Sequence, residues 1–167
     1  DTITFNTVNA RYVRMQGVKR GLPYGYSLWE MEVYATVKET AEYGVVSKNK
    51  IATTSGTETE AMAAANAFDG DEGTRWSSNF ADDAWIAVDL GKTYAIDKVV
   101  LNWEAAYGKA YKIQTSTDGN NWTTVKDLTN QDGGEDTITF NAVNARYVRM
   151  QGVTRALPYG YSIYEFE

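Results

Sequence analysis

Two short stretches of this chain combine residue types that could do chemistry. The run Trp103–Gly108 (WEAAYG) sets two aromatic rings beside the carboxylate of Glu104, next to a glycine that permits a tight loop. Such a group can cover the apolar face of a small polar ring and accept hydrogen bonds from its hydroxyls. The run Asp69–Thr74 (DGDEGT) places hard oxygen atoms close together, and its glycines let the chain curl. Calcium prefers such oxygen ligands, many of them backbone carbonyls.

The composition excludes several other kinds of chemistry. The 167 residues contain no His and no Cys, so the usual general acid–base group, disulfides, thiol nucleophiles and zinc clusters are absent. A net charge of -6 argues against binding to nucleic acid or to anionic membranes, which need basic patches. No apolar run approaches the roughly 20 residues of a membrane span. We therefore expect neither nucleic acid nor membrane as a partner.

The chain contains a long internal repeat. Residues 1–32 recur as residues 136–167, an offset of 135, and six positions differ, mostly between residues of similar size. That period exceeds those of solenoid repeats and matches tandem whole domains. We interpret residues 1–34 as the C-terminal fragment of a preceding homologous module, residues 35–44 as a linker, and residues 45–167 as a complete or nearly complete module, which carries the whole acidic excess.

The elements that must position these groups are short strands. Segments in which apolar and polar residues alternate are separated by turns of Gly, Asn and Asp, which is typical of an antiparallel sandwich. These segments are residues 87–91, 96–103, 111–116, 122–125, 137–140, 146–150 and 162–166. The one predicted helix is Glu60–Phe68, with Thr59 as its N-cap.

The fragment 1–34 carries about three predicted strands, and so few strands cannot bury their apolar face alone. Disorder is one expectation, and pairing with an edge strand is another. Strand exchange with residues 136–167 of its own or a neighbouring module is the third, because a near-identical copy makes exchange cheap.

Five motifs, taken in order, resemble the signature of the coagulation factor 5/8 type C, or discoidin-like, domains, and in particular the bacterial carbohydrate-binding modules of family 32. They are Asn66–Ser78 (NAFDGDEGTRWSS), Trp85–Gly91 (WIAVDLG), Tyr111–Trp122 (YKIQTSTDGNNW), Ala145–Met150 (ARYVRM) and Gly160–Glu165 (GYSIYE). The resemblance implies an all-β fold, an antiparallel jelly-roll (discoidin-like) β-sandwich of about eight strands. It also implies a bacterial protein that is extracellular, either secreted or at the cell surface.

The resemblance further implies a structural calcium ion bound near the DGDEGT loop. Its ligands would be the side chains of Asp71, Thr74 and Glu165 and the carbonyls of Phe68, Gly73 and Tyr164. The alternative is that Asp69 and Asp71 only cap turns and that Glu165 points to water.

In this family the sugar site is built from loops at one end of the sandwich, which here are residues 53–60, 75–83, 103–108 and 155–161. Aromatic rings would cover the sugar face, and charged groups would bind its hydroxyls. The candidate carbohydrate-binding residues are Glu58, Arg75, Phe80, Trp103, Glu104, Tyr107 and Tyr159.

Structural roles compete with these assignments. Trp103 could pack under its loop as core, and Phe80 could be a lid on the core. Arg75 could pair with Glu72 or Asp89, and Glu60 could simply favour a helix N-terminus. The remaining aromatic residues considered, Trp76, Trp85, Trp122, Tyr111 and Tyr147, are assigned to the core.

We therefore predict a non-catalytic carbohydrate-binding module that anchors a secreted polysaccharide-degrading enzyme to its substrate. Catalysis by two carboxylates across a cleft is not expected from a small sandwich whose carboxylates lie only on loops. Glu58 and Glu104 beside Asp82 and Asp83 would favour a ligand with ammonium groups, an amino-sugar polymer such as chitosan. The alternatives are a neutral glucan or galactose-type glycan, and a cell-surface adhesion or spacer module that binds protein or matrix.

Overall fold

The computed structural model describes residues 1–6, 8, 10–35 and 43–167. The chain divides into two units, residues 1–43 and residues 44–167. Most of the predicted linker, residues 36–42, lies outside the described residues.

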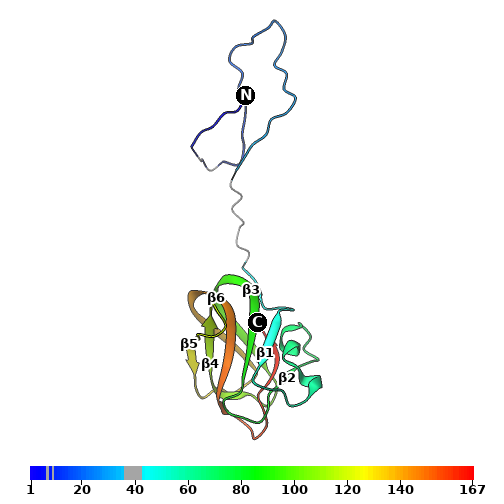
Figure 1. Ribbon diagram of the computed structural model, residues 1–167, viewed down its shortest axis with the longest axis vertical. Coiled ribbons are helices and arrows are strands. Elements are labelled where there is room, and N and C mark those ends of the chain that lie inside the picture. Colours follow the sequence, from blue (N-terminus) through cyan, green and yellow to red (C-terminus); the bar gives the residue numbers. More distant parts are fainter. Residues whose placement is uncertain (7, 9, 36–42) are drawn as a thin grey trace. The chain divides into compact units, whose positions relative to one another are not determined.

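Residues 44–167 form an all-β unit, as predicted (Figure 1). Its strands run in the order β2-β7-β3-β6-β4-β5, with β1 paired to β3. All of the strand pairs are antiparallel. The strands are β1 (Ile51–Thr54), β2 (Trp76–Ser77), β3 (Trp85–Trp103), β4 (Gly108–Ser116), β5 (Thr123–Leu128), β6 (Glu135–Arg155) and β7 (Ser162–Phe166).

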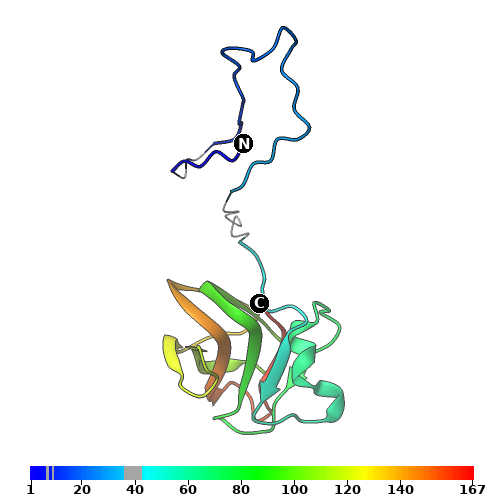
Figure 2. The same ribbon diagram turned by 45° about the horizontal axis from the view of Figure 1, so that its top comes forward.

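Two long strands, β3 and β6, each take part in both layers of the sandwich. The first part of β3 pairs with β1 and with the second half of β6, whereas its second part pairs with the start of β6 and with β7. The register between β3 and β6 shifts between Asp89 and Tyr94, where Gly91 has a positive φ of 84°. Bulges of this kind bend a strand and increase its twist. Figure 2 shows β3 and β6 curving together across the unit.

The core is filled from both layers by alternate residues of the strands. Trp76 and Tyr111 are fully buried, as predicted, together with Ile86 and Met150.

The core assignment is wrong for Trp85, Trp122 and Tyr147, which are only half-buried. They lie on the face of the sheet that points away from the core, where arginines cover their rings. The guanidinium of Arg149 lies 4.2 Å from the ring centroid of Trp122 and 5.7 Å from that of Trp85.

The predicted helix Glu60–Phe68 is present as two 3-10 helices, η1 (Glu60–Met62) and η2 (Ala64–Phe68). Between them Ala63 is extended, with ψ at 155°, which interrupts the helical hydrogen bonds. Thr59 precedes η1 but makes no capping hydrogen bond with its side chain. The alanine-rich stretch therefore winds tightly to bury Ala67 and Phe68 against β7.

Residues 1–35, so far as they are described, contain neither strand nor helix. Their apolar side chains are exposed, and Trp29 and Val18 are almost fully so. The three strands predicted there do not form, because a strand needs a neighbour to satisfy its backbone and cover its apolar face. Among the described residues there is no helix long and apolar enough to cross a membrane.

Candidate functional site

The site is centred on two serines that face each other across β2 and β7. Ser77 lies opposite Ser162 in the register, and both side chains are buried. Ser77 Oγ donates to Glu58 Oε2 at 2.8 Å, and Arg75 Nη1 donates to Ser162 Oγ at 2.6 Å. A carboxylate and a guanidinium are therefore held on one face of a single strand pair. Arg75 has a hydroxyl as its partner, while Asp89, one of its expected partners, binds Arg146.

Glu104 is attached to the same serine pair through its backbone. Its amide donates to the Ser162 carbonyl at 3.0 Å, and the Ser162 amide donates to the Ala106 carbonyl at 2.8 Å. The Glu104 carboxylate accepts the Ala106 amide at 3.0 Å, which fixes its direction in the turn after β3. Three of the predicted charged residues, Glu58, Arg75 and Glu104, are thus brought together from three separate loops.

Two exposed aromatic rings lie on the adjoining loops. Phe80 is 54% exposed and Tyr159 is 58% exposed, and their rings meet edge to face with centroids 6.3 Å apart. Tyr161, two residues further on, is fully buried. Between the two tyrosines, a Cβ on Gly160 would lie 2.1 Å from the Ser78 carbonyl oxygen, so the close approach of the loops requires glycine.

Trp103, the aromatic residue that we expected to stack on a sugar, is a core residue instead. It is 4% exposed, continues the inward alternation of Val99 and Leu101, and packs edge to face on Tyr111 at 5.2 Å. Its Nε1 donates to Asp136 Oδ2 at 2.8 Å, so its polar atom is satisfied inside the protein. Trp103 therefore packs beneath the loop as a core residue, and its ring face is not accessible to a ligand.

Tyr107 also has a mainly structural position. Its half-buried ring lies on Gly133, where a Cβ would come within 2.7 Å of the ring. Its carbonyl accepts the Ala156 amide at 3.0 Å, which joins the loop after β3 to the loop after β6. Tyr107 thus supports the loop that carries Tyr159 and does not extend the exposed aromatic pair.

The acidic side of the site is smaller than the sequence suggested. Asp82 Oδ1 accepts Arg155 Nε at 2.9 Å, and this hydrogen bond lowers the pKa of Asp82. Its charge is therefore balanced by Arg155, and the electrostatic argument depends on Glu58 and Glu104.

The predicted calcium site contains one buried carboxylate oxygen that lacks a partner. Glu165 Oε1, on β7, makes no hydrogen bond in the described part of the chain. Burial raises the pKa of Glu165, and the nearby charge of Asp69 raises it further. Of the alternative considered above, the capping of turns by Asp69 and Asp71 is found, whereas the Glu165 Oε1 atom is enclosed by protein and does not face water. A buried carboxylate oxygen without a partner, close to a second negative charge, is an environment that a bound cation would stabilise.

The surrounding loop uses its oxygens for turns. Asp69 accepts the Asp71 amide and the Thr74 hydroxyl, both at 2.8 Å, and Asp71 accepts the Gly73 amide at 2.9 Å. Among the described residues, no group of three or more acidic or His side chains could hold a metal ion by itself. An ion here would depend on carbonyl and hydroxyl oxygens, which calcium accepts. The residues present fit calcium on those terms, with Asp69 as a carboxylate that the predicted ligand set lacked.

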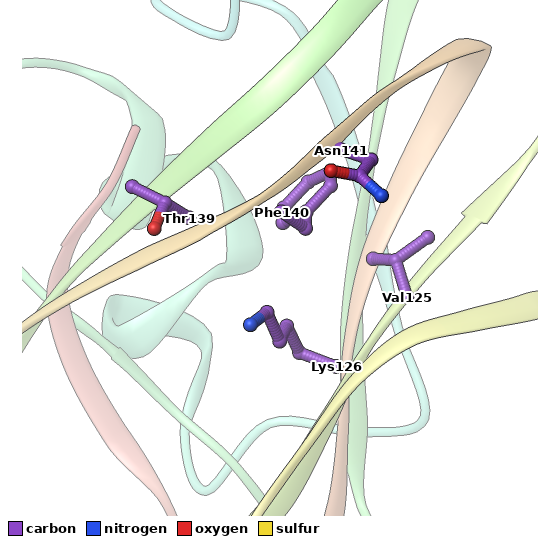
Figure 3. Close-up of a pocket in the computed structure, with 5 residues that line it drawn as sticks. All are labelled: Val125, Lys126, Thr139, Phe140 and Asn141. Carbon is purple, nitrogen blue, oxygen red and sulfur yellow. The ribbon is translucent and has the colours of Figure 1, made fainter.

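A surface hollow lies away from this site. It has a volume of about 460 Å³ and is lined by Val125 and Lys126 of β5 and by Thr139, Phe140 and Asn141 of β6. Figure 3 shows Lys126 extending into the space next to the Phe140 ring. It joins none of the residues gathered around Ser77 and Ser162, and it has no carboxylate among its lining residues.

Sequence reasoning missed the residues that bring the site together. Ser77 is hydrogen-bonded to Glu58, and Ser162 is hydrogen-bonded to Arg75. Serines within strand segments have no sequence pattern that would mark them as part of a site. Asp136, which anchors Trp103, lies in the repeat and reads as an ordinary polar strand residue. The inward position of Trp103 could have been found, because it has the same parity as the apolar residues Val99 and Leu101.

The comparisons with known proteins identify the class of protein as a carbohydrate-binding module without a catalytic function. The family model of the NedA-like, galactose-binding domain of F5/8 type C matches residues 66–150. The chain belongs to the F5/8 type C family, and its structural neighbours include carbohydrate-binding modules of family 32.

Three relatives illustrate this. A crystal structure of chitosan-binding module 2 in complex with chitotriose, from a chitosanase/glucanase of Paenibacillus sp. IK-5, is 47% identical, with a TM-score of 0.72; the match covers 74% of this chain and 98% of that module. The family 32 module of AlyQ, in complex with 4,5-unsaturated mannuronic acid, is 26% identical, with a TM-score of 0.60 over 70% of this chain and 91% of that one.

The third relative is the polysaccharide lyase 8 family protein HylA of Enterococcus faecalis. It is 38% identical over 109 residues, which is 60% of this chain. The matched region spans only 8% of the lyase.

Proposed function

We propose that this module binds an amino-sugar polymer of the chitosan type and anchors a secreted polysaccharide-degrading enzyme to it. The observation that carries the proposal is the gathering of Glu58, Arg75 and Glu104 around the Ser77–Ser162 pair. Two carboxylates and one guanidinium leave the cluster with a net negative charge, which favours a ligand that carries ammonium groups.

The aromatic pair supplies the other half of the recognition. Phe80 and Tyr159 expose about half of their surfaces, enough to cover the apolar face of one sugar ring. Arg75 would donate to a pair of ring hydroxyls, and Glu58 and Glu104 would accept from hydroxyl or ammonium groups. The chitosan-binding module that is 47% identical to this chain supports the same ligand class.

Calcium is proposed as a structural ion of the loop 69–74. Glu165 and Asp69 would supply carboxylate oxygens, with further oxygens from the Thr74 hydroxyl and neighbouring carbonyls. The ion would hold the loop that leads into Arg75, and so link the metal to the charged side of the site. Its role would be positional, since this module carries out no reaction.

The aromatic side of the site is open to solvent, since Phe80 and Tyr159 are more than half exposed, so we expect a weak affinity for a single site. A tandem copy of the module on the same polymer would increase retention through effective concentration. The sequence repeat is consistent with such a tandem arrangement of modules. Because polysaccharide substrates of this class lie outside the cell, we expect the parent enzyme to be extracellular. The parent enzyme would be a hydrolase or a lyase that acts on polysaccharides.

The test is retention of the full chain on chitosan, a neutral glucan and a galactan at low and at high salt. Glu104→Gln and Glu58→Gln should each weaken chitosan retention by about tenfold, because each removes a charge-assisted hydrogen bond worth about 1.5 kcal/mol or more. Glu60→Gln is the matched control, since it removes the same charge from the exposed helix η1 two residues away.

Loss of chitosan retention at high salt would support the proposal, since salt screens the attraction between exposed charges. Salt-insensitive retention on the glucan or galactan would identify the neutral glycan as the ligand instead. If a correctly folded chain bound none of these glycans, the result would favour the adhesion or spacer role.

A further inference from the structure

Arg155, at the end of β6, connects the two loops that carry the exposed aromatic rings. Its Nε and its backbone amide both donate to Asp82 Oδ1, at 2.9 and 3.1 Å. Its Nη1 donates to the carbonyls of Pro158 and Tyr159, at 3.4 and 3.0 Å. Asp82 follows Phe80 on one loop, and Tyr159 belongs to the other. One guanidinium therefore binds both loops at the same time.

Part of this arrangement is encoded locally. In the repeated segment, Arg20 Nη1 donates to the carbonyls of Pro23 and Tyr24, at 3.2 and 3.3 Å, although no strand surrounds it. The turn from the arginine to the tyrosine therefore forms without a sandwich. Only the bonds to Asp82 need the folded module.

The second loop is also fixed close to the first by hydrogen bonds between side-chain and backbone groups. Tyr161 Oη donates to the Asp82 carbonyl at 2.7 Å, and the Tyr161 amide donates to Ser78 Oγ at 2.8 Å. At Gly152 a Cβ would lie 2.6 Å from the Asp82 carbonyl oxygen, so the chain at this point passes against the loop without room for a side chain. Arg155 completes this set of contacts on the solvent side.

We propose that Arg155 is a positioning residue, which holds the Tyr159 ring at a fixed spacing from Phe80 so that both can cover one saccharide ring. That the two rings contact a sugar rests on the proposed function. That Arg155 joins the two loops rests on its hydrogen bonds in the structure. The Arg155 side chain is 19% exposed and that of Asp82 is 58% exposed. Because its Asp82 side is open to solvent, this ion pair is screened and contributes modestly to stability, so its main effect is on geometry.

The test is Arg155→Lys, which keeps the charge but loses the planar fork that reaches Asp82 and two carbonyls together. The matched control is Arg146→Lys. Arg146 forms the same kind of ion pair with Asp89, with hydrogen bonds of 2.8 and 2.7 Å. It lies on the same strand as Arg155 but bonds to neither of the loops that carry Phe80 and Tyr159. Affinity of the full chain for chitotriose is measured in the wild-type and Tyr159→Ala backgrounds.

Arg155→Lys should weaken chitotriose binding by about three- to tenfold in the wild-type background and by less than about twofold when Tyr159 is already Ala. Arg146→Lys should leave the affinity unchanged. An equal loss in both backgrounds would show that Arg155 does not act through Tyr159 and would overturn the proposal.

A second readout needs no ligand. Amide hydrogen exchange at Tyr161, whose amide binds Ser78 Oγ, should be faster in Arg155→Lys and unchanged in Arg146→Lys. Unchanged exchange in Arg155→Lys would overturn the inference even if the module binds no chitotriose. Chitotriose binding that is as tight in Phe80→Ala as in the wild type would instead count against the proposed aromatic site, which separates the two failures.

Discussion

Replacing Trp103 should affect folding, whereas replacing Phe80 should affect binding. Trp103 is 4% exposed and donates to Asp136, so Trp103→Ala leaves a large cavity and removes a buried hydrogen bond. Large aromatic residues cut to Ala in a core cost about 3–5 kcal/mol. For a unit of this size that corresponds to a fall in melting temperature of roughly 10–20 °C.

Phe80→Ala should leave the melting temperature nearly unchanged, because a substitution at an exposed position usually changes stability by about 0.5 kcal/mol or less. The ring is 54% exposed, so about half of it is left for a sugar to cover. Full burial of Phe is worth about 1.5–3 kcal/mol, and half of that is about 1 kcal/mol, or somewhat less than tenfold in affinity.

The assay pairs thermal melts with chitotriose titration on the wild-type chain, Trp103→Ala and Phe80→Ala, at a temperature where all three are folded. Folded Trp103→Ala should retain most of its affinity, with any loss traced to its lower stability. An unchanged melt combined with complete loss of binding in Trp103→Ala would refute the assignment of Trp103 to the core. An unchanged melt combined with a partial loss of affinity, somewhat less than tenfold, in Phe80→Ala would agree with it.

Three further results are expected. Calcium should raise the melting temperature relative to chelator, and Glu165→Gln should abolish that difference; an equal shift in the variant would remove Glu165 from the ion's ligands. The Arg146 hydrogen bond lowers the pKa of Asp89, so its stabilisation is present above the ordinary Asp pKa of about 3.9 and is lost as the pH falls through the lower folded-state value. Asp89→Asn should therefore flatten the loss of stability in denaturant titrations below about pH 5. Gly160→Ala should lower both melting temperature and affinity, because its Cβ would strike the Ser78 carbonyl, and a variant equal to wild type in both would contradict this.

Much of the fold could be predicted from the sequence because its signals are local. Alternating apolar residues and Gly, Asn and Asp turns identified the strands, and ordered motifs identified the family. The extended Ala63, which splits the expected helix into two 3-10 turns, could not be predicted, since burial of Ala67 and Phe68 against β7 decides it.

The sequence by itself determined the candidates for sugar binding, because the types and loop positions of residues such as Glu58, Arg75 and Tyr159 suit that chemistry. The tertiary structure decided which of the candidates face solvent. It placed the Tyr107 ring against Gly133 and paired Asp82 with Arg155. The physical reason is that burial and pairing depend on contacts between segments far apart in the chain, such as Ser77 with Ser162, and no local pattern records those contacts.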